Sequence, residues 1–310
     1  MIQSVWYTLM QVIVPFSVPV LAGVLLVRFQ GLETKPLLII VLYYIVPAMI
    51  FTNLSAVQLS LAELAGIALF FLINTLLLWI VAFAVGKILN LPDPEQAGLN
   101  LVSTLSNAVN YGLPLILLAF GQLGMEKAAV YVVFQMIFTN TAGVYFASRS
   151  NFSVKQAVMT IFKLPAIYAA ILAIALRFAG LSLPTGIENG ISMVAQALPP
   201  IMLAVLGAQM ARAKSSVLEK EQKAAFWSGL GIRMLISPFI ALLTLRILGI
   251  EGLLFPVMLI LASMPVAVNA GVMAEKFGAS SNFVSKCILW TTISSFIVLP
   301  ILITLVSQSV

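Results

Sequence analysis

Histidine is absent from the chain, and cysteine occurs once. Without histidine, the chain has no imidazole for acid–base catalysis, for a metal site or for haem ligation. The single cysteine, Cys287, excludes an intrachain disulfide and a cysteine cluster for zinc or iron–sulfur, so we expect a small buried apolar residue there. Paired carboxylates and clusters of metal ligands are also missing, which argues against an enzyme. We expect neither a cofactor nor a metal.

Charged residues are scarce as well. They make up 8% of the chain, against about 25% in soluble proteins, whereas 62% of the residues are hydrophobic. This composition is typical of an integral membrane protein. The formal net charge is +6, but no run of Lys and Arg is interleaved with aromatic residues, so we do not expect nucleic-acid binding.

Long apolar stretches fill most of the chain. A spanning helix needs about 20 largely apolar residues. Ten stretches qualify, near residues 6–28, 36–54, 62–87, 95–121, 125–148, 162–179, 187–211, 223–248, 252–277 and 282–306. Turn signals such as Leu91-Pro92-Asp93-Pro94 separate them. The sequence therefore predicts an all-α integral membrane protein with ten transmembrane helices.

The basic residues support this count. With the N-terminus outside, the odd-numbered loops and their flanks face the cytoplasm and hold twelve basic residues: Arg28, Lys35, Lys87, Arg149, Lys155, Lys163, Arg212, Lys214, Lys220, Lys223, Lys276 and Lys286. The opposite loops and flanks hold three, Lys127, Arg177 and Arg246. This asymmetry follows the positive-inside rule, so we expect a multi-pass protein of the cell inner (plasma) membrane with both termini outside.

Short motifs recur in the two halves of the chain. Arg28-Phe29-Gln30-Gly31-Leu32 resembles Arg177-Phe178-Ala179-Gly180-Leu181 at an offset of 149 residues, and Phe120-Gly121 matches Phe277-Gly278 at 157. Each half holds five predicted spans, within residues 1–150 and 160–310. Because five is odd, the second half must enter the membrane from the opposite side. The expected architecture is two inverted five-helix repeats, as in many secondary transporters.

The fourth and ninth predicted spans are interrupted in the middle. Span four contains, within eight residues, Asn107, Asn110, Tyr111, Gly112 and Pro114. Span nine has Pro265 and Asn269 at the matching depth. Proline removes a backbone donor and glycine permits unusual conformations, so each span should form two half-helices joined by an extended stretch. Matched breaks of this kind indicate a substrate site near the bilayer midplane, formed by two broken crossover helices.

Two broken helices that cross would direct two helix N-termini at one point. Each N-terminus carries about half a positive charge and free N–H groups, which favours an anion. The side chains of Asn107, Asn110 and Asn269 can add amide donors without placing a full charge in the membrane. The alternative is a pair of proline kinks that only adjust helix packing.

Arg233 lies in the middle of span eight, where a charge is costly and faces a bundle interior or a water-filled cavity. An offset of 159 residues relates it to Asn74, the only strongly polar residue at the centre of span three. Arg233 can balance the charge of a substrate or an acidic residue, donate to loosened backbone at a crossover, or clamp carbonyl groups as a structural element. No Asp or Glu lies clearly in the middle of a span, which disfavours sodium–proton exchange.

A milder polar set occupies spans five and ten, namely Gln135, Asn140, Thr141, Thr291, Thr292, Ser294 and Ser295. Small polar residues commonly join transmembrane helices, so we expect these side chains to serve packing. Pro47 in span two and Pro199-Pro200 in span seven occupy corresponding places, and we interpret them as kinks of a scaffold.

The chain resembles the auxin efflux carrier family over essentially its whole length. The most specific motifs are Asn107 followed by Gly112-Leu113-Pro114-Leu115, and Met264-Pro265 leading to Ala274-Glu275-Lys276-Phe277. The resemblance implies ten helices in two inverted repeats, with spans 1, 2, 6 and 7 as a scaffold and spans 3–5 and 8–10 as a moving transport domain. It also implies that the crossovers hold the carboxylate of an organic acid, a role that falls to Asn107, Gly112, Pro114 and Pro265.

The chain departs from plant members of that family in two ways. Plant members often show an additional proline in each crossover, where this chain has Ser106 and Ala270, and many carry a long cytoplasmic loop that is short here. Bacterial relatives are associated with dicarboxylates such as malate and malonate.

We therefore expect a secondary transporter of a small organic anion, auxin-like or a dicarboxylate such as malate or malonate, with elevator-type alternating access. The alternative is a cation or proton exchanger, or a channel, on the same inverted-repeat fold, and a receptor-like sensor also stays open. The expected partners are a small carboxylate substrate and the lipid bilayer, with a homodimer as a further candidate.

Overall fold

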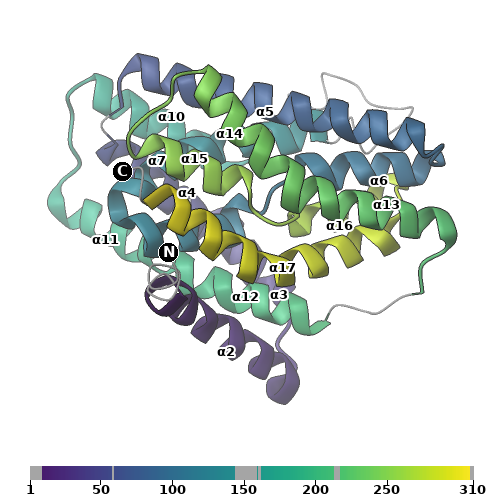
Figure 1. Cartoon of the computed structure of the whole chain (residues 1–310). Helices are drawn as coiled ribbons and strands as arrows, with labels where there is room; N and C mark the ends of the chain where they lie inside the picture. Colours follow the sequence, from purple (N-terminus) through teal and green to yellow (C-terminus); the bar gives the residue numbers. More distant parts are fainter. Residues whose placement is uncertain (1–8, 58, 144–158, 160–161, 213–216, 308–310) are drawn as a thin grey trace.

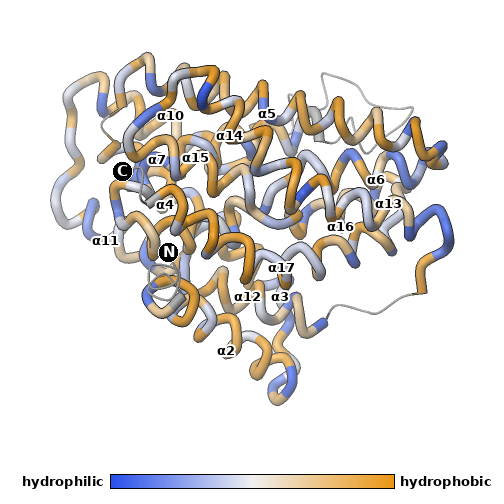
Figure 2. Tube along the Cα trace, in the orientation of Figure 1, coloured by the Kyte–Doolittle hydropathy of each residue, from blue (hydrophilic) through white to orange (hydrophobic). Residues whose placement is uncertain are grey.

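The computed structural model describes residues 9–57, 59–143, 159, 162–212 and 217–307. These residues form a helical bundle in which the longer helices lie side by side (Figure 1). Figure 2 shows apolar residues along the helices, with hydrophilic residues gathered mainly toward the ends of the bundle. Within this described part of the chain no β-strand forms, and the only β-type pairing is one isolated bridge between Ser106 and Val266.

The helices of the first half include four short π-helical segments, labelled η. In chain order the elements are η1 (Leu9–Ile13), α2 (Val14–Gln30), α3 (Thr34–Ile40), η2 (Val41–Ile45), α4 (Val46–Ala56), α5 (Leu61–Ile88), α6 (Asp93–Thr104), η3 (Ala108–Gly112), α7 (Leu113–Phe138) and η4 (Thr139–Gly143).

The second half has one π-helical segment among its described elements. These are α10 (Pro165–Phe178), α11 (Thr185–Gln196), α12 (Leu198–Arg212), α13 (Lys220–Gly231), η5 (Ile232–Ile236), α14 (Ser237–Ile247), α15 (Leu254–Ala262), α16 (Val268–Phe277) and α17 (Ser281–Ser307).

Seven of the described helical stretches are long and apolar enough to cross a membrane, so the chain is a multi-pass membrane protein. The sequence predicts ten spans, and the difference lies mainly where helices are interrupted. Predicted spans four and nine contain α6, α15 and α16, which have only 12, 9 and 10 residues. Predicted span six is α10, with 14 residues. The ten-span arrangement therefore stays a prediction.

The boundary between predicted spans four and five falls inside α7. Gly121 has φ 65° and ψ −162° there, which is not helical and which only glycine adopts without strain. The two parts of α7 on either side of this residue are therefore separate helical pieces. Counted by length alone, residues 108–141 form a single long stretch.

Four of the five π-helical segments in the described residues end two residues before a proline. The prolines are Pro15, Pro47, Pro114 and Pro238, each at the second position of the α-helix that follows η1, η2, η3 or η5. Proline lacks the N–H that an α-helix would use, and its ring clashes with the carbonyl one turn earlier. The preceding turn widens into a π-turn as a result. These bulges are therefore encoded locally in the sequence.

The helices pack in two groups. Helix α2 packs along α12, and α4 packs against α10 and α11, whereas α5, α6 and α13–α17 pack on one another. Helix α7 contacts members of both groups. The α2–α12 contact is especially close, because a Cβ atom at Gly23 would overlap the backbone of Ala204 and one at Gly207 would overlap the backbone of Val20. Small residues that let two backbones approach are a common basis of helix packing in membranes.

Substitution Gly207→Ala should separate α2 from α12. The added methyl group would overlap the Val20 carbonyl group, and overpacking of this kind costs about 1–3 kcal/mol. We expect a lower apparent melting temperature in detergent, followed by tryptophan fluorescence. The matched control is Gly190→Ala in α11, where no atom lies within 4 Å of the new Cβ. Equal melting temperatures for the two variants would contradict the close backbone contact.

Candidate functional site

The two interrupted regions of the chain meet and pair with each other. The Asn107 N–H donates to the Pro265 carbonyl oxygen at 2.8 Å, and the Ala267 N–H donates to the Leu105 carbonyl oxygen at 2.9 Å. Ser106 and Val266 face each other between these bonds as an antiparallel bridge. An extended backbone inside a membrane must satisfy its polar groups within the protein. Each break therefore supplies the partners that the other needs.

Two helices begin at this crossing. Segment η3, which continues into α7, starts after Asn107, and α16 starts after Ala267. Neither residue caps its helix with a side-chain hydrogen bond. The first N–H groups of a helix have no partner within the helix and carry a partial positive charge. Both helix starts thus present donors near the crossing.

A cavity of about 160 Å³ lies against both helix starts. Val109 and Asn110 line it from η3, and Val268 and Asn269 line it from α16. Asn107 lines it as well, and its side chain is 3% exposed. The Asn107 Nδ2 atom has no hydrogen-bond partner among the described residues. A buried amide donor without a partner is costly, so a ligand acceptor here would be stabilising.

Amide side chains dominate the polar part of this cavity. They are Asn107, Asn110, Gln135, Asn140 and Asn269, and no charged residue is among the lining residues. Two helix N-termini together with uncharged amide donors form an environment that suits a small anion.

Arg233 lies at the crossing but does not line the cavity. Its side chain is 1% exposed and donates to three backbone carbonyl oxygens. Nε donates to Met264 at 2.7 Å, Nη1 to Ser103 at 2.9 Å and Nη2 to Ala262 at 2.7 Å. Ser103 belongs to the last turn of α6, and Ala262 is the last residue of α15. The guanidinium therefore binds the C-terminal ends of α6 and α15 and the interrupted backbone that follows α15.

Helices α7 and α17 support the crossing with polar side chains. The Gln135 side chain in α7 donates to the Ser106 carbonyl oxygen. The Thr291 hydroxyl in α17 accepts from the Val266 N–H at 3.1 Å and donates to the Cys287 carbonyl oxygen at 2.6 Å. The two residues of the backbone bridge, Ser106 and Val266, are thus each held by a separate helix. Sequence reasoning assigned both side chains to helix packing.

The structure brings together three of the residues that the sequence singles out, Asn107, Asn110 and Asn269, on one cavity. Tyr111 points elsewhere. Its hydroxyl accepts from Ser295 Oγ at 3.0 Å, and its ring lies 4.6 Å from the Phe16 ring, measured between centroids.

Gly112, Pro114 and Pro265 shape the backbone and do not line the cavity. A Cβ atom at Gly112 would lie 2.8 Å from Leu261 Cδ2, so glycine allows α15 to approach η3. Pro114 is the second residue of α7 and follows the π-turn of η3. Pro265 provides the carbonyl that accepts from Asn107. Asn74 is buried in α5 and is not among the residues that line the cavity.

Gln135 and Asn140 line the cavity and are not among the predicted site residues. They are five residues apart, and Asn140 lies in the π-helical segment η4. Gln135 lies in α7, so the pair spans the junction of the α-helix and the π-helical segment. Two amide side chains in an otherwise apolar span are the signal that sequence reasoning had for them.

A larger cavity of about 510 Å³ continues from the first. The two share Leu38, Val268 and Asn269. The larger one, here called the vestibule, is also lined by Thr34, Arg212, Glu275 and Ser281. These four residues lie at or near helix ends, so the vestibule leads from the crossing to one end of the bundle.

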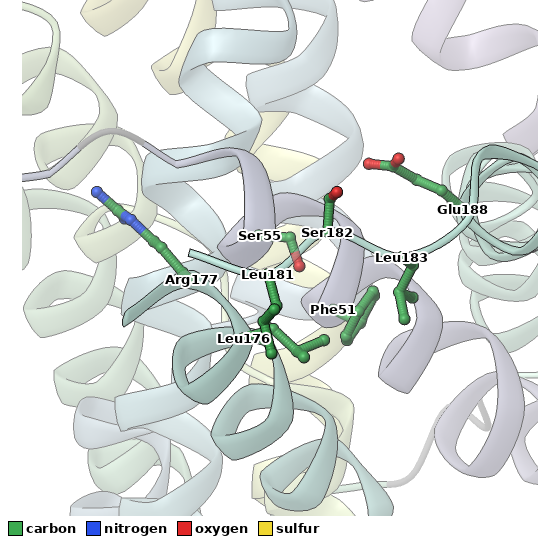
Figure 3. Close-up of a pocket in the computed structure, with 9 residues that line it drawn as sticks. Phe51, Ser55, Leu176, Arg177, Leu181, Ser182, Leu183 and Glu188 are labelled. Atoms are coloured by element: carbon green, nitrogen blue, oxygen red, sulfur yellow. The ribbon is translucent and has the colours of Figure 1, made fainter. Parts of the chain in front are cut away.

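A separate cavity of about 110 Å³ lies among α4, α10 and α11. Figure 3 shows Arg177 and Glu188 on opposite sides of it, with Ser55 between them. The Arg177 guanidinium donates to the Val57 carbonyl oxygen and so holds the chain after α4. No pair of helix starts meets at this small cavity in the described structure, so the crossing is the stronger candidate site.

Comparison with known proteins gives the family. A family model described as "Membrane transport protein" matches residues 9–153 and 148–303, which together make up most of the chain. The chain belongs to this family. Its resemblance to the auxin efflux carriers is thereby confirmed, and the family is one of membrane transporters.

Two archaeal proteins are similar to this membrane transport protein. An uncharacterised transporter of Methanothermobacter thermautotrophicus is 28% identical over 266 residues, which cover 84% of this chain and 85% of the relative. An uncharacterised transporter of Methanocaldococcus jannaschii is 27% identical over 272 residues, which cover 84% and 86%.

Substitution Thr291→Val should destabilise the transporter through the crossing. Valine keeps the shape of threonine but removes the acceptor for the buried Val266 N–H, and an unpaired buried donor costs about 1–3 kcal/mol. The matched control is Thr292→Val. The Thr292 hydroxyl is equally buried, yet its hydrogen bond runs to Ile288 in its own helix. Thermal unfolding in detergent should show a larger loss for Thr291→Val, and equal losses would contradict its role at the crossing.

Proposed function

We propose that this membrane transport protein is a secondary transporter of a small organic anion, bound as a carboxylate at the crossing. One observation carries the proposal: two helix N-termini and the unpartnered buried amide of Asn107 face one cavity. The substrate classes that fit are an auxin-like monocarboxylate and a dicarboxylate such as malate or malonate. No carboxylate side chain lines the cavity, so a cation or proton exchanger has less support.

The proposed architecture is ten spans in two inverted five-helix repeats, within residues 1–150 and 160–310. Two features support it. The breaks of the fourth and ninth spans pair with each other, as symmetry-related elements would. The first span packs on the seventh, and the second on the sixth, which is the exchange expected for elements related by symmetry. On this arrangement the crossovers lie near the midplane of the membrane.

The proposed mechanism is a displacement of spans 3–5 and 8–10 along a scaffold of spans 1, 2, 6 and 7. The separation of the helices into two packing groups supports this division, although α7 contacts both. In the positive-inside orientation, with both termini outside the plasma membrane, the vestibule opens to the cytoplasm. A ligand can drive such a motion only if it interacts differently with the two states. The vestibule would be closed, and an outer path opened, in the second state.

A hydrogen bond joins the two proposed parts of the transporter on the opposite side of the bundle from the vestibule. The Gln122 Nε2 atom donates to Asn53 Oδ1 at 3.0 Å, and Asn53 Nδ2 donates to the Met49 carbonyl oxygen at 2.8 Å. Asn53 belongs to α4 of the proposed scaffold, and Gln122 follows the break at Gly121 in the proposed moving part. This contact would have to break in an outward-open state.

Substitutions Asn107→Ala and Asn269→Ala should each strongly reduce transport at substrate concentrations that half-saturate the parent protein. A hydrogen bond to a charged group contributes about 1.5–3 kcal/mol, so the loss of one amide weakens binding about 10- to 100-fold. The measurement is uptake of labelled malonate, malate and an indole carboxylate into proteoliposomes, with thermal shifts for binding. Asn189→Ala, at an exposed position of α11, is the control for folding and insertion. Parent-like transport by both cavity variants would reject the crossing as the substrate site.

A cysteine pair at positions 53 and 122 should trap the transporter with its vestibule open. Mercuric ion would bridge the two thiols, and the native Cys287 is fully buried and so protected. We expect transport by the double variant to stop on treatment and to return after a thiol reductant, while each single-cysteine variant keeps its activity. If the bridged protein transports at the untreated rate, the two parts do not move apart at this contact.

A further inference from the structure

The positive charge of Arg233 has no carboxylate partner in the described parts of the chain. Its guanidinium is fully buried, and its three hydrogen bonds all run to backbone carbonyl oxygens. A buried charge without compensation is strongly destabilising, so the three carbonyl groups must supply the compensation.

The compensating charge comes from helix ends. The C-terminal end of a helix carries about half a negative charge, located on carbonyl groups without an intrahelical partner. Arg233 binds Ser103 in the last turn of α6 and Ala262 at the end of α15. The two ends together amount to about one negative charge, which the guanidinium balances. Ser237 Oγ also donates to the Ala262 carbonyl oxygen, at 2.9 Å, so this end is doubly held.

This balance determines the sign of the electrostatic potential in the cavity at the crossing. Four helix ends meet there: the C-termini of α6 and α15, and the N-termini of η3 and α16. Without the arginine, two positive and two negative ends would largely cancel. With the C-termini neutralised, the two N-termini leave about one positive charge next to the cavity. Arg233 therefore favours an anion that it does not touch.

The atoms that surround the guanidinium are also those that an alkali cation would use. In carriers with interrupted helices, unwound carbonyl groups and half-helix C-terminal ends coordinate the coupling ion. Here Met264, Ser103 and Ala262 form such a set, and the buried Ser103 Oγ has no hydrogen-bond partner among the described residues. The side chain of Arg233 occupies the centre of this set.

We propose that Arg233 is a covalently attached replacement for a coupling cation, so that the anion cavity is formed without bound Na⁺ or K⁺. This role rests on the proposed anion site, and Arg233 acts as a positioning residue through the helix ends. Two consequences follow. Anion binding by the parent protein is independent of the alkali cation present. Removal of the guanidinium exposes a carbonyl site that a small cation in solution can fill.

The test compares the parent with Arg233→Ala and Arg233→Lys in detergent and in proteoliposomes. Carboxylate binding is measured by thermal shift and calorimetry in choline, sodium, potassium or guanidinium chloride at equal ionic strength, with guanidinium kept at millimolar, non-denaturing concentrations. We expect the parent to bind equally in all salts. Arg233→Ala should bind at least about tenfold more weakly in choline and should recover in guanidinium or sodium. Arg233→Lys should stay close to the parent.

Asn107→Ala is the control, because the loss of a cavity amide cannot be repaired by guanidinium. A requirement of the parent for sodium or potassium would overturn the proposal. So would unchanged anion affinity of Arg233→Ala in choline, or a loss that no cation restores in a variant that still folds.

A second readout needs no substrate and can be used even if Arg233→Ala folds poorly. The melting temperature of Arg233→Ala should rise in guanidinium or sodium relative to choline, while that of the parent should not. Absence of this difference rejects the cation site. If the difference is present but the parent binds no carboxylate, the proposed substrate fails and the role of Arg233 as an internal cation stands.

Discussion

The pairing of two interrupted helices through their own backbones is the interaction on which the rest of the structure depends. At the point where each helix is interrupted, the backbone of Asn107 bonds that of Pro265, and the backbone of Ala267 bonds that of Leu105. A membrane offers no water to solvate an open backbone, so neither break is tolerable without the other. Once the two are paired, four helix ends are brought to one place. The charges of these ends, the burial of Arg233 and the amide-lined cavity all follow from that meeting.

Polar side chains near the crossing have two different roles. Gln135, Thr291 and Arg233 hold the backbone at the break, and their hydrogen bonds are made within the protein. Asn107 keeps an unpartnered donor next to the cavity, and Asn110 and Asn269 line it. The side chains that hold the backbone keep the crossing in one conformation. The asparagines leave hydrogen-bonding groups free for a ligand. On the proposed function, the backbone of such a site stays fixed while its open side exchanges ligand.

The helical class, the membrane location and the places of the breaks were predictable, because each depends on local composition. Hydrophobic length reveals spans, and a cluster such as Asn110, Gly112 and Pro114 reveals an interruption. Side-chain direction was not predictable. Tyr111 is adjacent to Asn110 but points into an aromatic cluster with Phe16, because neighbouring residues on a helix point about 100° apart and the sequence does not show which of the two faces the cavity. Asn74 and Arg233 occupy related positions in sequence, yet only the arginine is long enough to span three carbonyl groups.

The π-turns before prolines change the phase of the helices that contain them. In an α-helix each residue advances the direction of the side chain by about 100°. A π-turn accommodates one residue more than the α-helical ladder, so all side chains beyond it are rotated by about that angle relative to an uninterrupted helix. Loss of one residue from η3 would restore a regular ladder and would rotate the side chains at the start of α7 relative to those before η3. Within these helices, therefore, the number of residues matters as well as their identity, because the insertion or deletion of one residue changes the direction in which the following side chains point.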